Sequence, residues 1–487
     1  MMTRERIVAA LVAALFAATG LVQQPELSVE RIFDSRDFSP EEISVDWMDD
    51  GRYYTRIERA EGRTDLFKVD ARTGDCELLL HEADLVPPGA AEPLTIDSYR
   101  FSTDGRKLLI GTDEQRIWRR SRRAIYYVYD FETETLIPAS SRPGHQGYAK
   151  LSPDGSSLAF VRDNNIYVTD LATGQEKALT EDGSEDIING TTDWVYEEEL
   201  SLVDGFRWSP DGKRIAFWRF DQSPIPPFYL IDQTTLYPEL KPVRYPKAGT
   251  DNSEVQLGVV ELASGKTTWI YVNPEYGEFY IARMDFTNSP HEIWFRLLNR
   301  HQNRMDLMLA DARTGASRVI MTDTDDAWID IDYNALIWIE DGDKFVYLSE
   351  RDGYGQLYLF RRDGSLVRKL TAGDWDVTNV YGVDERRGLV YFSGAADGPL
   401  VRPLYRIGLD GEGFTRISGA TGTHDVSFDP TFTYYVDSYS EVGLPPTQTL
   451  RTADGEPVRT LADNSALQQK LDALELRRPE FIAVPVE

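Results

Sequence analysis

Short runs in which apolar and polar residues alternate recur along most of the chain, and each follows a turn rich in Asp and Gly. Three clear copies are FSTDGRKLLIG from Phe101, LSPDGSSLAFV from Leu151 and WSPDGKRIAFW from Trp208. Alternation with a period of two is the pattern of a half-buried β-strand, and glycine readily adopts the positive φ that tight turns require. We therefore expect each copy to form a strand, a turn and a second strand.

Looser copies of this unit complete a repeat. They begin at Trp47, Met284, Ile339, Val383 and Phe428, and with the three clear copies they make eight. Between them lie segments such as DLATGQEKALT and DARTGASRVIM, in which a Thr-Gly turn joins two further strand patterns. A unit of three or four strands that recurs in this way is typical of a β-propeller, whose blades bury their faces against each other. The sequence predicts an all-β, eight-bladed propeller, with a pair of β-sandwiches as the alternative.

The longest interruption of the repeat lies between Trp208 and Met284. Its middle part, FDQSPIPPFYLIDQTTLYPELKPVRYPKAGT, contains repeated prolines. Proline has no amide hydrogen for a sheet ladder, so we expect a long excursion between strands. Long loops on a rigid scaffold are places where binding functions concentrate.

A short helix is predicted just before this interruption, in the segment TDWVYEEEL. Asp193 is a suitable N-cap residue, and three consecutive glutamates follow it, Glu197, Glu198 and Glu199. They are either a solvated helical turn or a binding site for a positive charge. Neighbouring residues on a helix diverge by about 100°, so their spacing alone does not decide between the two.

The N-terminus carries the features of an export signal. Arg4 and Arg6 precede the largely apolar run Ile7–Val22, and Ala18-Thr19-Gly20 is a candidate cleavage site. We expect residues 1–22 to be a signal peptide or an N-terminal membrane anchor. The protein is then exported and located in the periplasm or outside the cell.

Composition excludes several kinds of partner. The formal net charge is −29 and the pI is near 4.6, which argues against nucleic acid as a ligand. Cys76 is the only cysteine, so no intrachain disulfide can form, and the five histidines have no metal-ligand spacing. We expect neither a metal nor a cofactor.

Four segments, taken in order, resemble the propeller of the dipeptidyl peptidase IV family of serine exopeptidases. They are TTDWVYEEEL, RWSPDGKRIAFWRFD, YPKAGTDN and LNRHQNRMDLMLADARTG. The similarity extends from about Val29 to the C-terminus, and the string DWVYEEE is its most specific part. The resemblance implies eight blades, in agreement with the repeat count. It also implies peptide substrates with a free N-terminus.

The resemblance assigns roles to three residues. By position, Glu198 and Glu199 bind the α-ammonium of the substrate, and Arg119 in IWRRSRR helps to hold the substrate and the glutamates. Near neutral pH the α-amino group is largely protonated, and charge-assisted hydrogen bonds to carboxylates are stronger than neutral ones. We expect Glu197 to support the local helix or an ion pair. Other alignments of the arginine are open: Arg120, Arg122 and Arg123.

Catalytic residues of a serine hydrolase are missing from the sequence. It contains no G-x-S-x-G nucleophile elbow, the feature that an α/β-hydrolase requires. We expect residues 23–466 to form the propeller and residues 467–487, with a helix over Gln468–Leu476, to lead into a hydrolase domain beyond this chain. The parent protein would be a dipeptidyl peptidase that releases dipeptides with Pro or Ala second, and this chain alone would be inactive.

The sequence also allows two other functions and one assembly. The chain could belong to a tripeptidyl peptidase of the same family. The number of residues released depends on the distance between the glutamates and the nucleophile, and the sequence does not give this distance. The chain could instead be a stand-alone propeller that binds peptides or proteins without catalysis. A homodimer is among the assemblies that the sequence allows.

Overall fold

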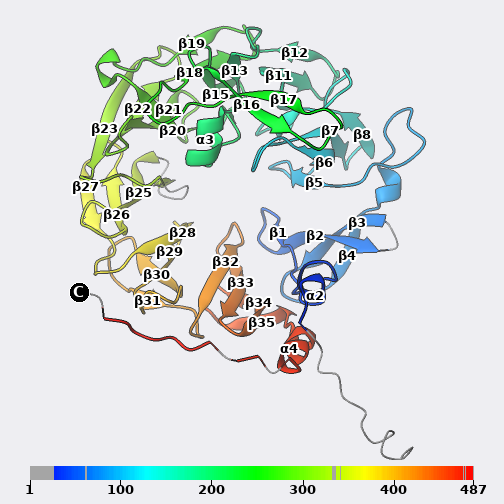
Figure 1. Cartoon of the computed structure of the whole chain (residues 1–487), viewed down its shortest axis with the longest axis vertical. Helices are drawn as coiled ribbons and strands as arrows, with labels where there is room; N and C mark the ends of the chain where they lie inside the picture. The colour runs from blue at the N-terminus through cyan, green and yellow to red at the C-terminus, as the bar shows by residue number, and fades with distance from the viewer. Residues whose placement is uncertain are drawn as a thin grey trace, which may run out of the picture.

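The computed structural model describes residues 27–60, 63–331, 336–339, 342–474, 476–477 and 479–485. Within these ranges, eight antiparallel sheets are arranged as a ring around a common centre (Figure 1). The expected signal segment, residues 1–22, lies outside the described residues. No helix in the described part of the chain is long and apolar enough to cross a membrane.

The first three blades each contain four strands in sequence order. Blade 1 comprises β1 (Asp46–Trp47), β2 (Tyr53–Ala60), β3 (Arg63–Asp70) and β4 (Cys76–Leu80). Blade 2 comprises β5 (Ser98–Phe101), β6 (Lys107–Arg116), β7 (Arg122–Asp130) and β8 (Thr135–Pro138). Blade 3 comprises β9 (Gly147–Leu151), β10 (Ser157–Arg162), β11 (Asn165–Asp170) and β12 (Glu176–Ala178).

Blade 4 departs from this plan, because its innermost strand is split in two. It comprises β13 (Ile187–Asn189), β14 (Phe206–Trp208), β15 (Arg214–Asp221), β18 (Glu254–Glu261) and β19 (Thr267–Trp269). Both β13 and β14 pair with β15. The chain between them forms helix α3 (Trp194–Glu199), so the helix is an insert on the inner edge of blade 4.

The last four blades return to four strands in sequence order. Blade 5 comprises β20 (Phe279–Phe286), β21 (Glu292–Asn299), β22 (Arg304–Asp311) and β23 (Ser317–Thr324). Blade 6 comprises β24 (Leu336–Ile339), β25 (Lys344–Ser349), β26 (Gln356–Arg361) and β27 (Leu366–Lys369). Blade 7 comprises β28 (Val377–Asp384), β29 (Leu389–Gly394), β30 (Leu404–Gly408) and β31 (Thr415–Arg416). Blade 8 comprises β32 (Thr423–Phe428), β33 (Tyr434–Glu441), β34 (Leu444–Thr452) and β35 (Pro457–Ala462).

The predicted eight-bladed propeller is confirmed. Each predicted repeat falls where the first strand of a blade turns into the second, as at Phe101 between β5 and β6. Gly105, Gly155 and Gly212 of the three clearest copies have φ values of 69°, 66° and 66°. These turns therefore require a residue that accepts the left-handed region, which is the physical basis of the repeated Asp-Gly.

Side-chain contacts close the ring between blade 1 and blade 8. The indole Nε1 of Trp47 donates to the carbonyl oxygen of Ser427 at 3.2 Å. Arg459 donates to the hydroxyl of Tyr54 at 3.1 Å, and Tyr54 is itself fully buried. In the described residues each blade is one continuous stretch of chain, so these contacts join the first and last blades without an exchanged strand.

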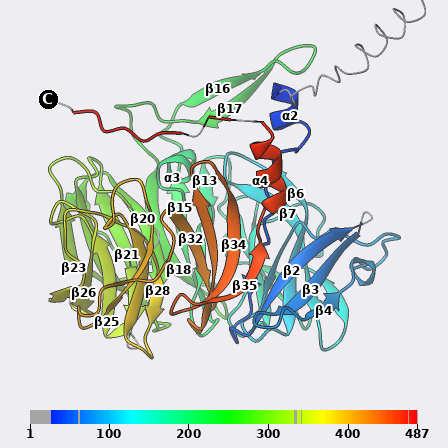
Figure 2. The same ribbon diagram turned by 90° about the horizontal axis from the view of Figure 1, so that it is seen from below.

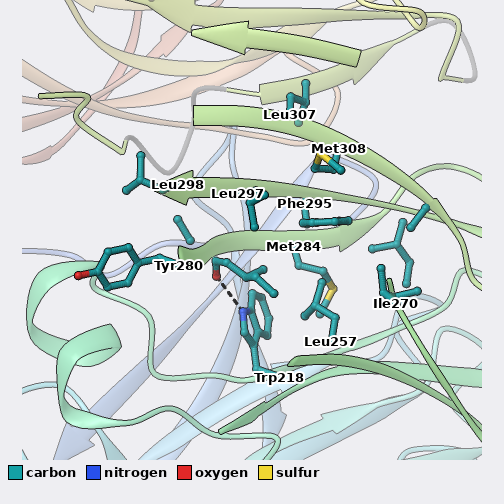
Figure 3. Close-up of a cluster of buried hydrophobic side chains, with 14 of the residues drawn as sticks. Trp218, Leu257, Ile270, Tyr280, Met284, Phe295, Leu297, Leu298, Leu307 and Met308 are labelled. Atoms are coloured by element: carbon teal, nitrogen blue, oxygen red, sulfur yellow. Dashed lines mark hydrogen bonds between the residues drawn. The ribbon is translucent and has the colours of Figure 1, made fainter. Parts of the chain in front are cut away.

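The largest buried cluster lies between blades 4, 5 and 6 and includes the underside of α3. Trp218 on β15 is completely buried, and its indole Nε1 donates to the carbonyl oxygen of Ile281 on β20 at 2.9 Å (Figure 3). Met284 and Phe295 of blade 5 pack in the same cluster. The part of the ring that carries α3 therefore rests on a continuous apolar interior.

The expected long excursion between strands is present, and within it the chain forms a two-stranded ribbon that the sequence analysis did not predict. Strands β16 (Pro227–Asp232) and β17 (Glu239–Arg244) pair with each other and with no blade. Both strands are edges, and prolines are tolerated there because an edge strand has amide groups outside the ladder. The ribbon rises from the same side of the ring as α3 and α4 (Ser465–Asp472) (Figure 2).

Helices are few in the described residues. Helix α4 begins and ends earlier than the helix expected over Gln468–Leu476, and it buries Leu467. A five-residue helix that the sequence analysis did not predict, α2, spans Val29–Phe33. Two short 3-10 helices cover Glu82–Asp84 and Pro274–Tyr276.

Candidate functional site

Helix α3 begins at the capping residue that the sequence predicted. The Asp193 carboxylate accepts from the backbone N–H of Tyr196 at 2.9 Å and from the hydroxyl of Ser253 at 2.6 Å. Asp193 is 5% exposed, and this burial raises the pKa of its carboxyl group, although the two hydrogen bonds oppose the shift. The cap therefore ties the start of the helix to blade 4.

The buried face of α3 determines which way its other face points. Val195 and Tyr196 pack in the large apolar cluster, and the Tyr196 hydroxyl accepts from the backbone N–H of Ile281 at 2.8 Å. With this face turned to the blades, the helix projects into the space that the ring encloses (Figure 1). The glutamates at its C-terminal end are thereby held on a fixed support.

Glu198 forms an ion pair with Arg119, which lies at the tip of the hairpin between β6 and β7. The Arg119 Nε lies 3.0 Å from Glu198 Oε2 and 3.2 Å from Oε1. The side chain of Glu198 is 17% exposed and that of Arg119 is 71% exposed. Two of the three predicted site residues therefore meet, although they come from blades 2 and 4.

The neighbouring arginines contact other groups. Arg122 pairs with Glu114, and Arg123 donates to the amide oxygen of Gln115 at 3.2 Å. Among the contacts recorded for the described residues, Arg119 is the one arginine of this run whose side chain reaches the glutamate triplet. This placement favours the alignment through Arg119 over the alternatives.

Glu197 is buried, with 4% exposure. Its Oε1 accepts two backbone hydrogen bonds, from the N–H of Arg120 at 2.8 Å and from that of Ser121 at 3.0 Å. The expectation that Glu197 supports the local helix or an ion pair was wrong, since its recorded partners are amides of the β6–β7 hairpin. A solvated turn is also excluded for this residue. Nothing in the local sequence signals this contact, because the partners lie 76 and 77 positions away.

Glu199 is exposed at the end of the helix and has no recorded partner among the described residues. It follows Glu198 directly in the sequence, and the Glu198 carboxylate pairs with the guanidinium of Arg119. Such an arrangement has unused acceptor capacity next to an ion pair, and it suits a ligand that carries a positive charge and several N–H donors.

A cavity of about 600 Å³ opens next to the end of α3. Ser201, which follows the helix, is in its wall, and the remaining wall comes mainly from blades 5, 6 and 7. Tyr347, Arg351 and Asp323 line it, with Arg351 and Asp323 forming an ion pair. The wall of this cavity includes neither the three glutamates nor Arg119, so the cavity adjoins the end of α3 through Ser201.

In the described ranges, no group of three or more His, Cys, Asp or Glu side chains is arranged to hold a metal ion.

Fold and site together define an eight-bladed β-propeller with a cluster of glutamates and an arginine on its inner side. The sequence profile of the family described as "Dipeptidyl peptidase IV (DPP IV) N-terminal region" matches residues 102–446. The chain belongs to this family.

Several known proteins are similar to the chain. Dipeptidyl peptidase 4 of Trichophyton rubrum is 30% identical over 467 residues, which cover 92% of this chain and 58% of that protein. A probable dipeptidyl peptidase 4 of Aspergillus fumigatus is 30% identical over 478 residues, with coverage of 94% and 60%. The crystal structure of Porphyromonas gingivalis dipeptidyl peptidase 4 superposes with a TM-score of 0.86 at 32% identity, covering 92% of this chain and 63% of that one. The chain thus spans about three fifths of the length of these relatives.

Proposed function

We propose that this chain is the substrate-recognising propeller of an exported serine dipeptidyl peptidase. In this proposal Glu198 and Glu199 bind the α-ammonium group of the substrate, and Arg119 lies beside them. The observation that carries it is the ion pair of Glu198 with Arg119 next to Glu199, whose carboxylate is exposed and uncommitted.

The chemistry of an exopeptidase explains these residue types. An α-ammonium has three N–H donors, and two carboxylates on neighbouring helix positions can accept from it. Arg119 offsets part of the repulsion between the carboxylates, and its remaining N–H groups are free to donate to a substrate carbonyl oxygen. Because α3 packs firmly on the blades, its glutamates would hold the N-terminus of the substrate at a fixed distance from the cleavage site. This contribution to catalysis is substrate positioning.

In this proposal the residues of the site bind the substrate, and another part of the protein cleaves the peptide bond. We propose that an α/β-hydrolase domain supplies the nucleophile, and that the preferred substrates have Pro or Ala in second position. The relatives that bear the name dipeptidyl peptidase 4 are longer than the span they share with this chain, which supports the proposal.

Peptide binding by the purified chain tests the site directly. Saturation-transfer NMR with Ala-Pro-Ala amide, which has a free N-terminus, is compared with the N-acetylated peptide. We expect Glu198→Gln and Glu199→Gln each to weaken binding of the free peptide by about 1.5–3 kcal/mol, the range for a charged hydrogen bond. Glu412→Gln, at an exposed glutamate of blade 7, is the matched control. Equal binding of the free and acetylated peptides would instead indicate a propeller that binds without recognising a chain end.

A further inference from the structure

The hairpin that carries Arg119 is held mainly by its backbone. The Arg119 side chain is 71% exposed, and ion pairs of such exposure contribute little to keeping a long side chain in place. The tip is closed instead by hydrogen bonds to Ser121, whose carbonyl and hydroxyl oxygens accept from the N–H groups of Ile117 at 2.9 Å and Trp118 at 3.2 Å. Arg116 adds a bond to the carbonyl oxygen of Arg119 at 2.9 Å.

Glu197 connects this closed tip to α3. Its Oε1 receives both the Arg120 and the Ser121 amide, at 2.8 Å and 3.0 Å. Glu197 and Ser121 are buried, at 4% and 5% exposure. A buried carboxylate that accepts from two amides makes short, charge-assisted bonds, and removing it leaves buried donors unpaired. Two adjacent residues of one helix thus hold the hairpin. The Glu197 carboxylate binds the backbone amides of the hairpin, and the Glu198 carboxylate binds its Arg119 side chain.

We propose that Glu197 is a positioning residue of the ammonium site: it sets the hairpin tip so that Arg119 reaches Glu198. The inference rests on the proposed function and deepens it, since Glu197 itself does not face the substrate. Two contacts from one turn of α3 define the place and the direction of the guanidinium, which one exposed ion pair cannot do.

Two substitutions separate the hydrogen bonds from the charge. Glu197→Leu removes the acceptor at similar size, and it leaves the Arg120 and Ser121 amides without a partner. Glu197→Gln keeps an oxygen in the place of Oε1 and loses only the charge. Because one oxygen serves both amides, the glutamine variant can retain both bonds in weaker form, and it should rescue most of the function.

The first measurement is hydrogen exchange of residues 116–123, followed by mass spectrometry on the purified chain. We expect Glu197→Leu to accelerate exchange of the Arg120 and Ser121 amides by about tenfold or more, the effect of one lost hydrogen bond or two. Glu197→Gln should accelerate it less, and Glu198→Gln should leave it nearly unchanged.

The second measurement is the affinity for Ala-Pro-Ala amide in a double-mutant cycle with Arg119→Met. A positioning residue loses its effect when the residue it positions is gone. We expect Glu197→Leu to reduce affinity by about tenfold in the native background and by less than twofold in the Arg119→Met background. A residue that only stabilises the fold would reduce affinity equally in both.

The outcomes are distinguishable. Unchanged exchange in Glu197→Leu, or an equal loss of affinity in both backgrounds, would overturn the role of Glu197. If Glu197→Leu does not fold, the same cycle with Glu197→Gln decides, with a smaller expected loss of about two- to threefold. If Glu198→Gln leaves peptide affinity unchanged, the proposed function fails, and the exchange data still show whether Glu197 holds the tip.

Discussion

Glu198 and Arg119 are 79 residues apart in the sequence and lie in direct ion-pair contact, with Arg119 Nε 3.0 Å from Glu198 Oε2. One residue comes from a hairpin of blade 2 and the other from a helical insert of blade 4. The contact therefore exists only in a ring whose blades bring these two edges together.

The first prediction concerns the arginine. Arg119→Met should weaken binding of a peptide with a free N-terminus by about 1–3 kcal/mol, because a charged hydrogen-bond donor is lost and two carboxylates remain unbalanced. Arg122→Met removes a guanidinium of the same hairpin that pairs with Glu114, so it serves as the control. Titration by saturation-transfer NMR measures both. Equal losses would point to Arg122 as a second contributor, against the alignment through Arg119.

Peptide binding should depend on pH through the ligand. An α-amino group loses its proton near pH 8, so affinity for the free peptide should fall about tenfold between pH 7 and pH 9. The N-acetylated peptide has no such group, and its weak binding should stay constant over this range. A flat profile for the free peptide would mean that the site does not recognise the ammonium charge.

Fold stability should depend on pH through Lys150. Its ammonium donates to Asp204 at 2.5 Å and to the carbonyl oxygen of Phe206 at 2.6 Å. Burial is the main cause that lowers the pKa of Lys150 to about 8 from its usual 10.5, and the nearby Asp204 opposes this shift. Between these two values the unfolded chain binds more protons than the folded one, so stability rises with pH in this window.

Urea unfolding at pH 8 and pH 10 measures this effect against Lys150→Met, which lacks the titrating group. The native chain should gain about 2 kcal/mol relative to the variant over this interval. If the free energy of unfolding changed equally with pH in the two proteins, the pKa of Lys150 would be the same in the folded and unfolded chain.

The contact between blades 4 and 5 should be sensitive to Trp218. Trp218→Ala removes a completely buried ring and leaves the Ile281 carbonyl oxygen without its indole donor. Loss of a buried aromatic side chain costs about 3–5 kcal/mol, and thermal unfolding should show a clearly lower Tm. An exposed aromatic of the ribbon, Tyr237, provides the control, since Tyr237→Ala should change Tm little.

The purified chain should not hydrolyse Gly-Pro p-nitroanilide. Its sequence has no G-x-S-x-G elbow, and acyl transfer needs a nucleophile, a base and an oxyanion hole. A chromogenic assay after repeated purification measures this. Turnover that persists and resists serine-directed inhibitors would reveal a catalytic site that the sequence pattern does not show.

Local sequence was sufficient for the architecture. Alternating strands and Asp-Gly turns predict eight units, because a period-two pattern and a left-handed turn residue are properties of a few neighbouring residues. The capping role of Asp193 follows in the same way from the helix that begins after it. The ribbon β16–β17 was harder to predict, because prolines argue against strands except where the strand is an edge, and edges are not visible in a sequence.

The site depended on the tertiary structure. Three adjacent glutamates have the same chemistry in the sequence, yet Glu197 is buried against backbone amides, Glu198 pairs with Arg119 and Glu199 is exposed. What separates them is the helix rotation, about 100° per residue, combined with the hairpin that blade 2 places beside α3. The repeat, the turns and the start of the helix could be predicted from the residues alone, because these features rest on local backbone preferences. Only the closed ring decided what each glutamate touches, because its partners come from another blade.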